Sequence, residues 1–248
     1  FKGGNRIACR RAYSLGGGAY RIEGEVADTA PQVYPHKSFA EIKEYCIKND
    51  IRLSDYVFRI EPDIREYLDT IWETMVGAIK RGLSAEGVLP GGLGLQRKAK
   101  FLYSQRHIDE SPETRENRMV CAYSFAVAEE NAAGGTIVTA PTCGSSGVLP
   151  AVLYYVQKTR NVSKDAILRG LAVAGLIGNI IKTNASVSGA ECGCQAEIGS
   201  ASAMAAAALV DLKGGTAEQC AEAFAMALTN LEGLVCDPVA GLVEIPCI

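Results

Sequence analysis

The stretch of sequence that decides the fold lies near the end of the chain. Residues 194–236 read CQAEIGSASAMAAAALVDLKGGTAEQCAEAFAMALTNLEGLVC. Two helical segments, at about 198–213 and 217–231, flank a short Lys-Gly-Gly-Thr connection. The glycines suit the C-terminus of the first helix, and Thr216 with Gln219 suits the N-cap of the second. Because so short a connection makes consecutive helices antiparallel neighbours, the sequence predicts a helical hairpin.

This hairpin is expected to bring distant cysteines to one end. Each helix is roughly 22 Å long at 1.5 Å per residue, so the chain travels out and returns. Cys194 precedes the first helix, Cys236 follows the second, and the loop after it can turn back so that Cys247 reaches the same place. Three thiols beside helix ends suit a centre of zinc, copper(I) or iron–sulfur type. The alternative is that these are small buried side chains, and spacing does not choose between Cys192 and Cys194.

The number of thiols narrows the kind of metal centre. A structural zinc site takes four protein ligands, and the two histidines, His36 and His107, lie far upstream. Three cysteines instead suit a [4Fe-4S] cluster with one open iron, which is a Lewis acid that can bind a substrate. The chain has nine cysteines, an odd number, and no secretion signal, which argues against a disulfide framework and favours a cytoplasmic location.

The rest of the chain divides at about residue 34. Residues 1–34 are rich in glycine and contain alternating stretches, which predicts strands and loops from the end of a small α+β domain. Residues 35–248 have a helical period, no long strand pattern and a glycine-rich loop at 84–98. Helices before the hairpin are expected at about 38–49, 63–81, 117–130, 148–159 and 164–182. Ser38 with Glu41 is a capping-box pattern at the start of the first, and apolar residues at spacings of three and four form a stripe along the second. The predicted fold class is mainly α, with a short β-rich N-terminal segment.

Composition excludes several classes of partner. Hydrophobic residues make up 48% of the 248 residues, and the net charge is −3 without a Lys/Arg-rich block, so no nucleic-acid partner is expected. No run approaches the eighteen or so apolar residues that a membrane span needs; the most apolar, 167–181, contains Arg169 and Asn179 and is typical of a core helix. Because the chain begins at Phe1 and stops one residue after a cysteine, we expect a fragment of a longer protein.

Six segments carry a family likeness along nearly the whole chain. They are YSLGGG (13–18), EGVLPG (86–91), EENAAGG (129–135), APTCGSSG (140–147), KTNASVSGAECGCQAEIGSA (182–201) and GLVCDPVAGLVEIPCI (233–248). In sequence and in order they resemble the iron–sulfur-dependent L-serine dehydratases (L-serine ammonia-lyases) of bacteria.

The resemblance implies a lyase that converts L-serine to pyruvate and ammonia, a step of amino-acid degradation and gluconeogenesis, with an oxygen-sensitive [4Fe-4S] cluster and no pyridoxal phosphate. It implies that Cys194, Cys236 and Cys247 are the cluster ligands. It also implies that residues 1–34 are the end of a small β domain that precedes or pairs with the helical catalytic domain, and that helices following Cys247 are missing. We expect a homo-oligomer or an alpha/beta pairing.

The elimination of water from L-serine needs a base and a carboxylate-binding group in addition to a Lewis acid. Chelation of substrate by an open iron draws charge from Cα and makes the hydroxyl a better leaving group, so a base and a group that positions the carboxylate remain to be supplied. Lys182, Ser188 and Glu191 are the catalytic candidates, because they lie in the polar stretch that leads to Cys194. Lys182 is equally typical of a helix C-terminus, and Glu191 of a structural salt bridge.

Further residues are candidates for substrate binding. Asn184 and Ser186 precede the candidate ligand, the loop at 142–147 has backbone N–H groups before a helix, and the N-terminal glycine triplet suits a wall of the site. The full set is Ser14, Gly16, Gly17, Glu130, Asn131, Thr142, Gly144, Ser145, Asn184 and Ser186. Each also has an ordinary structural interpretation as a cap, a turn or a helix end.

Two other functions stay open. One is a cysteine desulfidase of the same architecture, because substrate specificity is not legible in these motifs. The other is a non-catalytic metal-binding or redox module, suggested by the Cys192-Gly193-Cys194 pair. A pyridoxal phosphate lyase is rejected, because Lys182 follows the candidate loop and lacks a Ser-x-Lys context.

Overall fold

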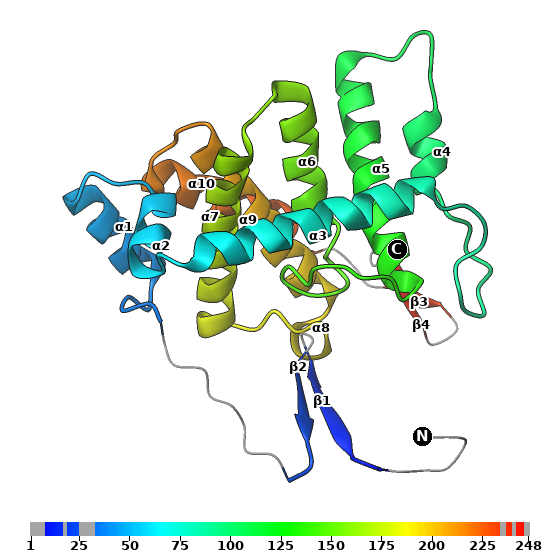
Figure 1. The fold of residues 1–248 in the computed structure, drawn as a ribbon, viewed down its shortest axis with the longest axis horizontal. Helices are drawn as coiled ribbons and strands as arrows, with labels where there is room; N and C mark the ends of the chain where they lie inside the picture. Colours follow the sequence, from blue (N-terminus) through cyan, green and yellow to red (C-terminus); the bar gives the residue numbers. More distant parts are fainter. Residues whose placement is uncertain (1–7, 17–18, 25–32, 234–236, 240–241, 246–248) are drawn as a thin grey trace.

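The computed structural model is mainly α-helical, which confirms the predicted fold class (Figure 1). The structure describes residues 8–16, 19–24, 33–233, 237–239 and 242–245. In chain order, the described elements are β1 (Ala12–Gly16), β2 (Ala19–Ile22), α1 (Phe39–Lys48), α2 (Leu53–Ile60), α3 (Ile64–Ser84), α4 (Ala99–Ser104), α5 (Pro112–Ala132), α6 (Val148–Arg160), α7 (Lys164–Asn184), α8 (Gly189–Cys192), α9 (Cys194–Leu212), α10 (Ala217–Asn230), β3 (Asp237–Val239) and β4 (Leu242–Ile245).

Side-chain caps explain where two of the helices begin. At α1, Ser38 Oγ accepts the backbone N–H of Glu41, and the Glu41 carboxylate accepts the backbone N–H of Ser38. Thr216 and Gln219 form the same reciprocal pair at α10. A capping box satisfies N–H groups that have no partner inside the helix. The capping boxes predicted at these two positions are therefore confirmed.

The predicted helical hairpin is confirmed by α9 and α10. The two helices contact each other along their length, and a Cβ built on Gly199, near the start of α9, would lie 3.4 Å from Cδ2 of Leu228, near the end of α10. The N-terminus of α9 and the C-terminus of α10 therefore lie together. Helix α9 begins at Cys194, four residues earlier than expected, because Gly193 adopts a φ of 76° that joins α8 directly to α9.

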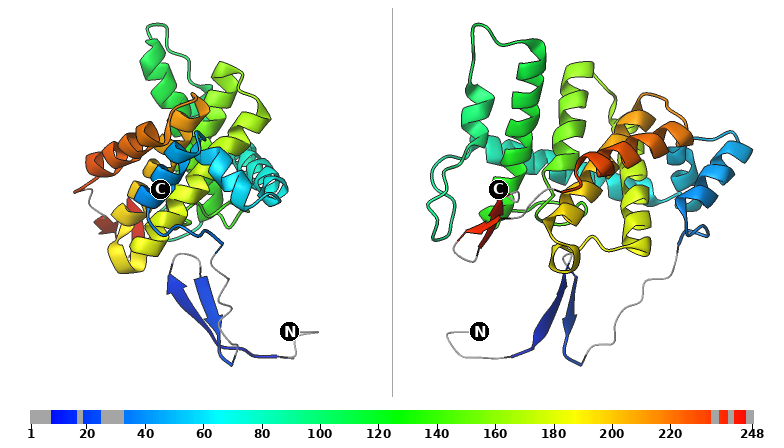
Figure 2. Two further views of the ribbon diagram at one scale, coloured as in Figure 1. Left: turned by 90° about the vertical axis from the view of Figure 1, so that its left-hand side faces the viewer. Right: turned by 180° about the vertical axis from the view of Figure 1, so that it is seen from behind.

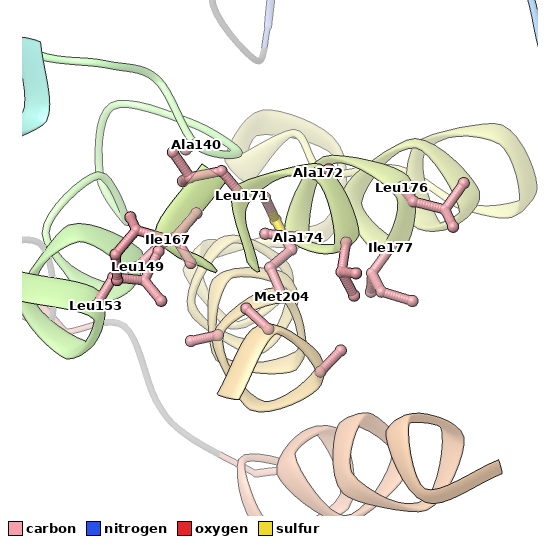
Figure 3. Close-up of a cluster of buried hydrophobic side chains, with 14 of the residues drawn as sticks. Ala140, Leu149, Leu153, Ile167, Leu171, Ala172, Ala174, Leu176, Ile177 and Met204 are labelled. Carbon is pink, nitrogen blue, oxygen red and sulfur yellow. The ribbon is translucent and has the colours of Figure 1, made fainter. Parts of the chain in front are cut away.

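Helix α7 is the central core helix. It packs against α2, α3, α6 and α9, and Figure 3 shows buried side chains of α6, α7 and α9 gathered where these helices meet. By length and composition alone α7 could cross a membrane, with a mean hydropathy of 1.4 over a window of which 56% is buried. The expectation that no segment approaches such a span is therefore wrong. Packing in the core explains the apolar composition of α7. Its charged residue Arg169 donates a hydrogen bond to the Asp55 carboxylate at 2.7 Å.

Several short elements were not expected from the sequence. Helices α2, α4 and α8 are too short to show a period. Helix α5 begins at Pro112 rather than near residue 117, because its exposed, charged first turn carries no apolar stripe. The antiparallel pair β3–β4 was not expected either, although its strands of three and four residues agree with the absence of a long strand pattern; so short a strand shows too few alternations to be recognised.

The N-terminal strands β1 and β2 form an antiparallel hairpin. Within the described part of residues 1–34, this confirms the prediction of strands. Figure 2 shows this hairpin projecting from the helical body, and β1 contacts α8. The placement brings the hairpin near the segment that leads into α9. The division into domains at residue 34 stays a prediction.

Candidate active site

A cavity of about 710 Å³ opens between α3, α7 and the segments at 138–141 and 185–188. At one end its lining is polar, with Asn179 and Lys182 from the last turns of α7 and Ser186, Ser188 and Glu191 from the segment that follows. We call this end the polar rim. The three residues predicted to be catalytic therefore line one cavity.

Hydrogen bonds order the polar rim. Ser186 Oγ donates to Glu191 Oε2 and accepts the backbone N–H of Ser188 at 3.1 Å. Ser188 is only 6% exposed, and its hydroxyl has no hydrogen-bond partner among the described residues. The structure shows no ion pair for Lys182 within the same residues. A buried hydroxyl without a partner is uncommon, so this end of the cavity is suited to a polar ligand.

Cys194 is the first residue of α9 and is buried, with 8% of its surface exposed. Its predicted partner ligands, Cys236 and Cys247, lie outside the described residues, so the ligand set stays a prediction. Within the described ranges, no three His, Cys, Asp or Glu side chains form a group that could hold a metal ion. The neighbouring Cys192 is exposed.

The other cysteine that the sequence places in the hairpin, Cys220, has a packing environment. It is buried in α10, and its Sγ donates to the carbonyl of Ala207 at 3.6 Å. Burial raises the pKa of the Cys220 thiol to about 12. A thiol that resists ionisation is a poor metal ligand, as expected for a core residue.

Glu197 is a site residue that sequence reasoning missed. It lies one helical turn after Cys194, so the two residues share a face of α9. Thr142 Oγ1 donates to Glu197 Oε2, and Ser145 Oγ lies 3.1 Å from Thr142 Oγ1. The other Glu197 oxygen lies so close to Gly189 that a Cβ there would clash with it. An acidic residue three positions after a candidate ligand was the available signal, but it equally suits the helix dipole.

Glu197 therefore joins three segments beside Cys194. The loop before α6 contacts it through the buried Thr142, α8 contacts it through the bare Cα of Gly189, and α9 carries it. This arrangement fixes the predicted substrate loop relative to the predicted cluster end of α9. Gly144 belongs to the same loop, in the turn that precedes α6.

Three substrate-binding candidates have structural partners instead. Asn184 Nδ2 donates to the carbonyls of Ile180 at 2.9 Å and Lys37 at 3.3 Å, which ties the end of α7 to the segment before α1. Glu130 accepts Arg81 Nε at 2.9 Å, and Asn131 Nδ2 donates to the Cys143 carbonyl at 3.4 Å. Neither Asn184, Glu130 nor Asn131 lines the cavity, and their roles toward substrate stay predictions.

The N-terminal candidates lie in or beside β1. The backbone of Ser14 pairs with Tyr20, and Gly16 pairs with Ala19 after a register shift. Gly17 lies outside the described residues. Since β1 contacts α8, this strand is close to the segment that carries Glu191.

Comparison with known proteins points to one family. The chain matches the family described as serine dehydratase alpha chain over residues 25–248. It is 40% identical to an L-serine dehydratase of Streptomyces coelicolor, over 99% of this chain and 57% of that protein. It is 42% identical to L-serine dehydratase 1 of Escherichia coli, over 100% of this chain and 58% of that protein. A probable L-serine dehydratase alpha chain of Bacillus subtilis is 41% identical, over 86% of this chain and 73% of that protein. The chain thus spans little more than half the length of the first two relatives.

Proposed function

This chain belongs to the serine dehydratase alpha chain family, and we propose that it is the helical catalytic part of an L-serine dehydratase. The reaction is the β-elimination of water from L-serine, followed by hydrolysis of the product to pyruvate and ammonia. The observation that carries this proposal is the polar rim, where Lys182, Ser188 and Glu191 line one cavity. In sequence, these residues lead directly to Cys194.

Lys182 is the proposed base. Lys182 Nζ takes the proton from Cα of L-serine, and the electron pair of that C–H bond forms the Cα–Cβ double bond. The Cβ–O bond breaks, and the leaving hydroxide takes the proton that Lys182 Nζ has accepted, so that water departs and the base is regenerated. The resulting 2-aminoacrylate tautomerises to an imine, which water hydrolyses to pyruvate and ammonia. A positioned base typically accelerates such a step by roughly 10²–10⁴-fold.

The other rim residues hold the substrate. Glu191, oriented by Ser186, binds the substrate ammonium group, and the unpartnered Ser188 hydroxyl donates to the carboxylate. Thr142 and Ser145, held by Glu197, do not line the cavity and are proposed to position the segment at 138–141 that forms one of its walls. Such contacts fix Cα beside the base, so that binding contributes to the rate of proton removal.

Cys194, Cys236 and Cys247 are proposed to hold a [4Fe-4S] cluster. Cys194 fits this role because it is the first residue of α9, where the helix dipole favours an anionic group. The contact of Gly199 with Leu228 supports the return of the chain to the same end shortly before residue 236. When bound, the cluster supplies a Lewis acid for the substrate hydroxyl and carboxylate. An open iron makes the activity oxygen-sensitive.

We also propose the partners and the cellular location of the protein. Because this chain spans only 57% of one relative and another relative is named as an alpha chain, we propose that this part works with a β part, in the same chain or as a partner, in a homo-oligomer or an alpha/beta pair. A cytoplasmic location suits its nine cysteines.

The test uses the full-length protein that contains this chain, purified without oxygen. Lys182→Met is expected to lower kcat for L-serine by at least roughly a hundredfold at unchanged iron content. Cys194→Ala is expected to lose iron and sulfide, whereas the matched control Cys220→Ala keeps both. Rates with L-threonine and L-cysteine distinguish a dehydratase from a desulfidase. Full turnover by Lys182→Met, or equal iron loss in the two cysteine variants, would contradict the proposal.

A further inference from the structure

One face of α7 runs along the whole cavity. Leu171, Gly175, Gly178 and Lys182 follow one another at spacings of four, three and four residues, so they share a helix face, and all four line the cavity. From Leu171 to Lys182 the helix rises about 16 Å. The cavity therefore has length as well as volume, with Lys182 at its polar rim.

Gly175 leaves space that no neighbour fills. A Cβ built on it meets no atom within 4 Å, whereas one on Gly170 of the same helix would lie 3.3 Å from Leu212 Cγ. Close packing therefore explains the glycine at 170 but not the one at 175. Glycine also destabilises a helix interior relative to alanine, so helix stability does not explain Gly175. The absence of a side chain there instead enlarges the cavity.

The interior of the cavity is apolar. Beyond the polar rim it is lined by the buried side chains of Leu68, Met75, Leu171 and Met204. L-serine has a single-carbon polar side chain that makes no use of such a surface. A cavity of about 710 Å³ is within the range of small-molecule pockets and exceeds what L-serine fills.

The polar rim indicates which charged groups a ligand of this cavity would carry. Glu191 offers a carboxylate at this end of the cavity, and Ser188 offers a buried hydroxyl without a partner among the described residues. The Ser188 hydroxyl can donate to a ligand carboxylate, and Glu191 suits a ligand ammonium group. Together these are the two charged groups of an α-amino acid.

We propose that this cavity binds α-amino acids with an unbranched apolar side chain, with the head at the polar rim and the side chain directed along α7 toward Gly175. The inference rests on the proposed function only in that L-serine would use the same rim. Since such a ligand has no β-hydroxyl to lose, it occupies the site without reacting. It would therefore compete with L-serine.

The probe is L-norleucine, titrated calorimetrically into the full-length protein without oxygen. It is expected to bind, and to raise the KM for L-serine without changing kcat. Hexanoate and pentylamine, which each lack one charge of the head group, are expected to bind at least roughly tenfold more weakly. Affinity should rise about fourfold per methylene from L-alanine through L-norvaline to L-norleucine.

Gly175→Leu fills the interior without touching the rim and is expected to weaken L-norleucine binding at least tenfold. The matched control is Gly77→Leu on α3, which lies outside the cavity lining and where an added Cβ meets only the end of the Arg81 side chain. An unchanged affinity in folded Gly175→Leu would overturn the proposal, and so would a flat chain-length series, which needs no variant. Turnover of L-serine without any binding of L-norleucine overturns this inference alone. Binding of L-norleucine without turnover overturns the proposed function alone.

Discussion

Glycines at the contacts of α5 and Gly175 on α7 have opposite surroundings. Where α3 crosses α5, a Cβ on Gly82 would clash with the backbone of Ala126, and where α6 begins, a Cβ on Gly147 would lie 2.6 Å from the Ser124 carbonyl oxygen. On α7, a Cβ on Gly175 would meet nothing. The glycines around α5 permit close packing, whereas Gly175 on α7 leaves a cavity open. The same residue type thus marks a close backbone contact in one place and open space in the other.

Charged groups reinforce this difference. Beside the close contacts of α5, Glu129 accepts the backbone N–H groups of Lys98 at 2.5 Å and Ala99 at 3.1 Å, and Glu130 pairs with Arg81. The other Glu129 oxygen, Oε2, lies 4.0 Å from Arg97 Nη1 and has no hydrogen bond among the described residues, so the polar groups beside α5 are held by ion pairs as well as hydrogen bonds. At α7, the unpartnered Ser188 hydroxyl instead borders the cavity and is available to a ligand.

The largest expected effect is that of Gly82→Ala. The added methyl group would force the backbones of α3 and α5 apart, because the atom it meets is a carbonyl rather than a flexible side chain. We expect a loss of about 3 kcal/mol in the free energy of unfolding, measured with urea. Gly77→Ala, on the same helix, is the control and should lose little. Equal stability of the two variants would mean that α3 and α5 are not in close contact.

A smaller effect of opposite sign is expected for Gly175→Ala. Its Cβ enters open space, so the helix gains from alanine without a clash. The free energy of unfolding is expected to rise by roughly 0.5–1 kcal/mol. Destabilisation of this variant in the same urea experiment would show that the space at Gly175 is filled in solution.

The smallest expected effect is a pH dependence of the free energy of unfolding, contributed by an ion pair at the start of α5. Arg118 bonds Glu110 at 2.5 Å, and this hydrogen bond holds the pKa of the Glu110 carboxyl below its ordinary value of 4.5. A lowered pKa in the folded state contributes stability above pH 4.5, which is lost as pH falls through the lowered value. Urea unfolding at pH 6.5 and 3.5 should therefore show a smaller loss for Glu110→Gln than for the unchanged protein. Parallel losses in the two proteins would rule out this contribution.

The parts of the fold that could be predicted are those that depend on residues close together in the sequence. The stripe of apolar residues located α3, and the capping pairs at Ser38 and Thr216 located the starts of α1 and α10, because these depend on residues within one or two turns. Helix α4 escaped prediction because its N-terminus is held by Glu129, thirty residues away. Long-range contacts of this kind leave no local pattern.

The candidate site shows the same division. Lys182, Ser188, Glu191 and Cys194 stand in one short polar stretch, so sequence reasoning singled them out together. Glu197 was missed because its role depends on Thr142, fifty-five residues upstream, and on the close approach of Gly189. An acidic residue near a helix N-terminus has the same local pattern whether it binds solvent or a loop.

By itself, the sequence determined the helical class, the antiparallel hairpin of α9 and α10, and the polar stretch that precedes Cys194, because periodicity, caps and short connections act between near neighbours. Only the tertiary structure decided which glycines are close contacts and which are open space, because that depends on what lies opposite each Cα. It also decided that Lys182, Ser188 and Glu191 line a cavity with an apolar interior, since the walls of that cavity come from helices far apart in the chain.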